Sequence, residues 1–176
     1  MPATPSTGPV AGLYTPEQRA RRDGTVWTLV QGLLAPVQFL VFLASLGLVV
    51  YSLRTGELLG WALGSVVLKT VLLYAIMVTG CIWEKVVFGK YLFAPAFFWE
   101  DVVSMGVMAL HTAYVVGWWS GALSPGELLW LALAAYASYV INAVQFVWKL
   151  RAARLQCPPS PADDLTPSPS RYGRAT

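Results

Sequence analysis

Four long apolar stretches, separated by short polar or glycine-containing breaks, divide most of the chain. Each stretch is long enough to cross a bilayer as an α-helix, which needs about 20 apolar residues. All eight tryptophans lie near the ends of these stretches, where their rings suit the membrane–water interface. We therefore predict an all-α integral membrane protein, a bundle of four transmembrane helices spanning approximately residues 26–53, 58–83, 97–119 and 127–150.

The segments outside the bundle are polar and differ from one another. Residues 1–13 predict a disordered leader, and residues 157–176, rich in Pro and Ser, predict a disordered tail. Residues 14–24 predict a short basic helix at the membrane surface, because Thr15 is a good N-cap, Pro16 follows it and Gln18 can complete a capping box. Residues 25–156 then form the four-helix membrane domain.

Composition supports this assignment and excludes several functions. Hydrophobic residues make up 56% of the chain and charged residues only 12%, about half the share of a typical soluble domain. The net charge of +3 is not gathered into a basic patch, so nucleic-acid binding is not expected. Cys81 and Cys157 have no metal-site spacing, and a single histidine cannot supply two axial ligands to a haem. We expect no metal site built by the protein and no cofactor.

The positive charges indicate an orientation. Ten lysines and arginines flank the N-terminal, middle and C-terminal segments that share one side of the membrane, whereas Arg54 stands alone on the other. Because cytoplasmic flanks are enriched in Lys and Arg, both termini are expected in the cytoplasm.

Ionisable residues inside apolar spans are costly and often mark a site. Glu100, Ser104 and His111 lie on one face of the third predicted span, and Asp101 follows Glu100 directly. With both termini inside, Glu84 reaches the same cytoplasmic end, and other polar residues gather there or nearer the midplane. The resulting catalytic candidates are Glu84, Glu100, Asp101 and His111. The candidate substrate-binding residues are Gln38, Lys69, Trp99, Ser104, Asn142 and Gln145.

Several carboxylates beside one histidine suit general acid–base catalysis on a hydrophobic substrate. Two adjacent buried carboxylates do not both ionise easily, so one of Glu100 and Asp101 is expected to hold a proton at neutral pH. Structural roles remain open for single residues. Lys69 could pair with a backbone carbonyl or a tyrosine hydroxyl, His111 could be a satisfied interior histidine, and Glu84 with Lys85 could be a solvated surface pair.

Four segments of the chain carry a family resemblance: residues 14–23, 28–39, 83–101 and 109–114. The longest, WEKVVFGKYLFAPAFFWED at 83–101, is the most specific. In these segments the chain closely resembles the 3-vinyl bacteriochlorophyllide hydratase family, called 2-vinyl in older naming, over about residues 14–156. The resemblance implies a membrane enzyme of bacteriochlorophyll biosynthesis in the inner membrane of a phototrophic bacterium. It implies water addition to the C3 vinyl group of a chlorophyllide or bacteriochlorophyllide, giving a 1-hydroxyethyl group.

Roles for the candidates follow as hypotheses from this chemistry. Glu100 or Asp101 would be the acid, and Glu84 or the remaining carboxylate would take a proton from water. His111 could instead ligate the substrate's magnesium, and Lys69 or the basic flanks could hold its propionate. A non-enzymatic pigment-binding or photosystem-assembly protein is the alternative function, and a transporter is a weaker one. Expected partners are the pigment, water and lipid, with a second copy of the chain or other pigment-biosynthesis enzymes left open.

Overall fold

The computed structural model describes residues 13–155, with side chains to residue 152, and all regular secondary structure in this part of the chain is α-helical. The predicted tail, and all but the last residue of the predicted leader, lie outside the described residues. The helices are α1 (Pro16–Gly24), α2 (Val26–Thr55), α3 (Leu59–Phe88), α4 (Phe98–Ser120) and α5 (Pro125–Leu155).

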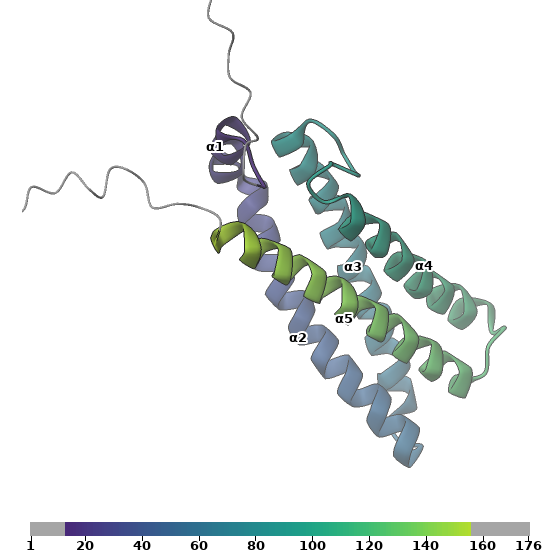
Figure 1. Ribbon diagram of the computed structural model, residues 1–176. Coiled ribbons are helices and arrows are strands. Elements are labelled where there is room, and N and C mark those ends of the chain that lie inside the picture. The colour runs from purple at the N-terminus through teal and green to yellow at the C-terminus, as the bar shows by residue number, and fades with distance from the viewer. Residues whose placement is uncertain (1–12, 156–176) are drawn as a thin grey trace, which may run out of the picture.

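Helices α2 to α5 are each long and apolar enough to cross a membrane, which confirms the predicted fold class. They alternate in direction, so the start of α2, the end of α3, the start of α4 and the end of α5 lie together at one end of the bundle (Figure 1). Helix α1 and the α3–α4 connection lie at this same end. The two short turns, between α2 and α3 and between α4 and α5, lie at the other end.

The bundle consists of two helical hairpins. Helix α2 packs most extensively on α3, and α4 packs most extensively on α5, whereas contacts between the two pairs are sparser. Buried Phe42, Tyr114 and Tyr136 belong to the core that joins the pairs. In this core the hydroxyl oxygen of Ser45 lies 2.6 Å from that of Ser65 and 2.5 Å from that of Tyr136, so hydrogen bonds link α2 to both α3 and α5.

Helix α3 extends beyond the predicted second span. That span ended at residue 83 and so left Glu84 outside the helix. The helix continues to Phe88 and ends at Gly89, whose φ of 82° lies in the left-handed region that glycine adopts without steric cost. The Gly89 N–H donates to the carbonyl of Lys85 at 3.0 Å and closes the last turn. Glu84 is therefore fixed on a helix rather than on a flexible loop.

Helix α5 starts earlier than the predicted 127 because its first turn is capped. The Glu127 carboxylate accepts hydrogen bonds from the backbone N–H and the hydroxyl of Ser124, at 2.8 and 2.7 Å, and Pro125 occupies the first helical position. The helix also continues to Leu155, beyond the predicted end at 150.

Helix α1 has the predicted capping box: the backbone N–H of Gln18 donates to the Thr15 hydroxyl, and the Gln18 side chain accepts from the Thr15 N–H. Tyr14, just before the helix, stacks on Phe88 with ring centroids 5.7 Å apart. Burial raises the pKa of Tyr14 while the Arg22 guanidinium, 4.8 Å from its ring, opposes that rise. Tyr14 therefore anchors α1 to the end of α3 as a neutral phenol.

Candidate acid–base site

Glu84 and Asp101 lie at the end of α3 and the beginning of α4, and both are almost fully buried, at 6% and 4% exposure. The loop between the two helices supplies one backbone donor to each carboxyl group. The N–H of Ala94 donates to Glu84 Oε2 at 3.3 Å, and the N–H of Phe93 donates to Asp101 Oδ2 at 2.7 Å. The loop thus binds both acids through main-chain groups.

The loop adopts an unusual backbone conformation to make these contacts. Phe93 has a φ of 57°, in the left-handed region that costs a residue with a side chain about 1–2 kcal/mol. Ala94, which follows it, is completely buried. Local strain of this kind persists where surrounding contacts enforce it, and here the two carboxylates accept hydrogen bonds from consecutive residues of the loop.

Because Phe93 and Ala94 are consecutive residues, the two carboxyl groups that accept their N–H groups are held at the same buried place. Two like charges in one buried place repel each other, so joint ionisation is disfavoured and the pair favours a state that holds one proton. A buried pair that holds one proton contains an acid and a base side by side. This is the chemical capacity that proton donation and water activation both need.

Glu100 precedes Asp101 but turns toward a different helix. Its carboxylate forms an ion pair with Lys149 of α5, with Oε2 and Nζ 2.6 Å apart. Lys149 was not among the site residues predicted from the sequence, although its helical spacing from Asn142 and Gln145 would have placed it on their face of α5. One turn after Glu100, the Ser104 hydroxyl donates to the carbonyl of Glu100 and accepts from Asn142.

Several other buried polar atoms have no hydrogen-bond partner within the described part of the chain. They are Gln38 Nε2, Ser52 Oγ, Lys69 Nζ, His111 Nε2, Asn142 Oδ1 and Gln145 Oε1. Lys69 is fully buried, and its ammonium lies 3.8 Å from the centroid of the Tyr139 ring, in a cation–π contact. Unpaired buried donors and acceptors are rare in folded proteins, so a group of them on several helices indicates a place that a polar ligand or water can fill.

His111 has a defined tautomer in this setting. Its Nδ1 lies 2.9 Å from the carbonyl oxygen of Val107, and because a carbonyl can only accept, Nδ1 carries the hydrogen. The neutral ring therefore presents the lone pair of Nε2, which can accept a hydrogen bond or bind a metal ion.

Trp99 is the predicted site residue that the fold separates from the rest. Its side chain is 70% exposed on the outside of α4, away from the buried carboxyl pair. It faces the surroundings of the bundle and not its interior.

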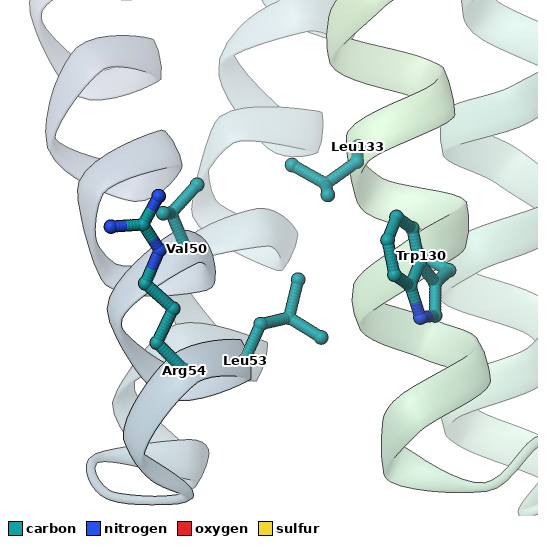
Figure 2. Close-up of a pocket in the computed structure, with 5 residues that line it drawn as sticks. All are labelled: Val50, Leu53, Arg54, Trp130 and Leu133. Carbon is teal, nitrogen blue, oxygen red and sulfur yellow. The ribbon is translucent and has the colours of Figure 1, made fainter.

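Two of the cavities on the bundle lie at its opposite ends. The larger, about 460 Å³, lies near the α2–α3 turn and is lined by Val50, Leu53, Arg54, Trp130 and Leu133 (Figure 2). Its lining holds no group that could serve as acid or base near neutral pH. The smaller, about 320 Å³, is lined by Glu100, Gln145, Trp148, Lys149 and Ala152 and lies at the end that carries the carboxyl pair. The buried carboxyl groups therefore lie at the end with the smaller cavity.

Comparison with known proteins agrees with this chemistry. A family model described as 2-vinyl bacteriochlorophyllide hydratase matches residues 14–152. A protein of that name from Cereibacter sphaeroides is 64% identical over 155 residues, which cover 88% of this chain and 96% of the relative. Another protein of that name, from Rhodobacter capsulatus, is 60% identical over 166 residues, which cover 94% of this chain and 96% of the relative. No solved structure matches the chain.

Proposed function

The chain belongs to the 2-vinyl bacteriochlorophyllide hydratase family, and we propose that it adds water across the vinyl group of a chlorophyllide or bacteriochlorophyllide with Glu84 and Asp101 as its acid–base pair. The single observation that carries the residue assignment is that these two buried carboxyl groups accept hydrogen bonds from the consecutive N–H groups of Phe93 and Ala94. Two acids held together in a buried place can share one proton, and so supply both a proton donor and a proton acceptor.

The reaction begins with proton transfer to the terminal carbon of the vinyl group. The protonated member of the pair supplies this proton, and the vinyl π electrons form the new C–H bond. Positive charge develops on the inner carbon, where the π system of the macrocycle delocalises it. The carboxylate formed beside that cation stabilises it electrostatically, and stabilisation of this kind is strong in a buried site.

Water then attacks the inner carbon while the other carboxylate removes one of its protons. The new C–O bond and the proton transfer together give the neutral 1-hydroxyethyl group. At this stage the two carboxyl groups have exchanged roles, since the original base now holds the proton. Because the loop holds the two groups together, the proton can pass back from one to the other, so the pair is restored without an external acid or base.

The remaining polar side chains position the substrate in this proposal. The macrocycle lies along the seam between the two hairpins, where the unpaired Gln38 Nε2 can donate to one of its carbonyl substituents. The unpaired amide oxygens of Asn142 and Gln145 can accept hydrogen bonds from the reacting water. Lys69 supplies a donor deeper in the same seam, and Ser104 holds the Asn142 amide in place. Trp99, on the outer surface of α4, contacts pigment that approaches through the bilayer.

We place the carboxyl pair at the cytoplasmic side of the inner membrane, with both termini in the cytoplasm. The support is the excess of Lys and Arg in the segments that meet at this end of the bundle. A reporter fused to the C-terminus and assayed in intact cells checks this orientation, because an external signal would require the opposite one.

A product assay tests the function. Membranes containing the protein are incubated with a vinyl chlorophyllide, and the expected result is a hydrated pigment with a blue-shifted absorption band. Cells that lack the gene should accumulate vinyl pigments. Retention of pigment by the membranes without any hydrated product would instead support a non-enzymatic pigment-binding protein.

His111 is proposed to ligate the magnesium of the substrate through Nε2. Replacing His111 by Leu should raise KM for the magnesium pigment by about 10-fold, the equivalent of about 1.4 kcal/mol of binding, and leave the magnesium-free pigment unaffected. Steady-state kinetics with both pigments make the measurement. An equal rise in KM for the magnesium pigment and the magnesium-free pigment would assign His111 a structural role in the bundle.

A further inference from the structure

We propose that Lys149 binds the free propionate of the pigment and makes the enzyme select the free acid over its ester. This inference rests on the proposed function, because it names a contact for the same substrate. Lys149 lines the 320 Å³ cavity at the end of α5 together with Glu100, Gln145, Trp148 and Ala152. The cavity therefore combines a cation, an aromatic surface and an apolar floor, which suit a carboxylate carried by a flat hydrophobic ring.

The ammonium group of Lys149 has capacity for a second anionic partner. It has three N–H donors, and one hydrogen bond, to Glu100, is formed within the described part of the chain. It also lies 5.2 Å from the centroid of the Phe97 ring. The Lys149 side chain is 28% exposed, whereas that of Glu100 is 10% exposed. The cation is thus the accessible member of the ion pair, and a carboxylate entering the cavity meets it first.

The position of Lys149 also fits the reacting pair. Asp101 follows Glu100, the ion-pair partner of Lys149, in the first turn of α4. On the macrocycle, the propionate is carried by the pyrrole ring next to the one that bears the vinyl group. One edge of the pigment can therefore place its carboxylate at Lys149 and its vinyl group at Asp101.

Lys69, which is fully buried in the bundle, does not meet this requirement. It lies 15 residues before Glu84 on the same helix, which is about 22 Å along the axis at about 1.5 Å per residue. That separation exceeds the spacing of substituents on neighbouring pyrrole rings. In the proposed binding mode, Lys69 instead donates a hydrogen bond to a carbonyl substituent of the macrocycle, deeper in the seam between the hairpins.

The experiment compares kcat and KM for the vinyl chlorophyllide and its methyl ester in membranes containing the full chain. Wild type should prefer the free acid by about 10-fold in kcat/KM, as expected for one charge-assisted hydrogen bond. Lys149→Met should remove this preference by raising KM for the acid about 10-fold. The kcat for the acid, and both kcat and KM for the ester, should stay almost unchanged. Lys149→Arg should retain the preference, and Arg151→Met, which removes an exposed cation two residues away, should leave it intact.

Glu100→Gln separates this role from a purely structural one. If Lys149 binds the propionate, removing its competing carboxylate should leave KM for the acid equal to or below that of wild type. The inference would be overturned if Glu100→Gln raised KM for the acid as much as Lys149→Met does. It would also be overturned if Lys149→Met raised KM equally for the acid and the ester. In either case the hydratase activity itself would stand. Wild-type membranes that hydrate neither pigment would overturn the proposed function, and this inference with it.

Discussion

Replacing Asp101 by Asn is expected to reduce turnover of the vinyl pigment by about 10²–10⁴-fold, the usual contribution of a general acid or base. Glu84→Gln should cause a loss of similar size, because either change leaves one ionisable group where the reaction needs both a donor and an acceptor. The fold should persist, since an amide oxygen can still accept the backbone hydrogen bonds that Phe93 and Ala94 now donate. Single-turnover assays in membranes, normalised to the amount of folded protein, make the measurement.

The matched control is Glu57→Gln, which alters an exposed carboxylate at the opposite end of the bundle. It should retain full activity. The double variant Glu84→Gln with Asp101→Asn should lose little more activity than either single variant, because residues that act as a unit are strongly non-additive. Near-normal turnover in both single variants would remove the pair from the mechanism.

Lys69→Met is expected to stabilise the protein and weaken its activity. A lysine at the centre of a membrane helix raises the free energy of insertion by about 2.5–3.5 kcal/mol. The cation–π contact with Tyr139 offsets about 0.5–2 kcal/mol of this cost. Removing the charge should therefore raise the unfolding midpoint in detergent by several degrees, at about 2–4 °C per kcal/mol for a chain of this size. Turnover should fall about 10-fold if the substrate accepts a charge-assisted hydrogen bond from the ammonium.

Tyr139→Phe supplies the comparison, because it keeps the aromatic face beneath the ammonium and removes only the hydroxyl. Its activity and stability should stay close to those of wild type. If Lys69→Met gained stability and kept full turnover, the lysine would have no part in binding the pigment. Stability gained with activity lost is the pattern of a residue kept for function.

The sequence predicted the membrane bundle well because the controlling physics is local. An apolar run of membrane length must form a helix to satisfy its backbone, whatever its neighbours are. The same local reasoning misplaced the end of α3 at residue 83. Glu84 and Lys85 look like the polar end of a span, but the helix continues until Gly89, the first residue suited to a left-handed C-cap.

The pairing within the site was only partly accessible from the sequence. Orientation and helix direction brought Glu84, Glu100 and Asp101 to one end of the bundle, as the alternating helices require. Which carboxylates meet depends on the rotation of α4 about its own axis and on a loop with Phe93 in a left-handed conformation. Neither is determined by the local sequence pattern. Glu100 and Asp101 therefore looked equivalent, although Glu100 pairs with Lys149 of α5 and Asp101 accepts a hydrogen bond from the α3–α4 loop.

The division of the bundle into two closely packed hairpins has a consequence for how the enzyme is made. The hairpin of α2 and α3 contains Glu84, and the hairpin of α4 and α5 contains both Asp101 and Lys149. During synthesis the first hairpin can leave the translocon and settle in lipid before the second has been translated. Under the proposed mechanism each half carries only one member of the acid–base pair, so activity is expected only after the halves dock.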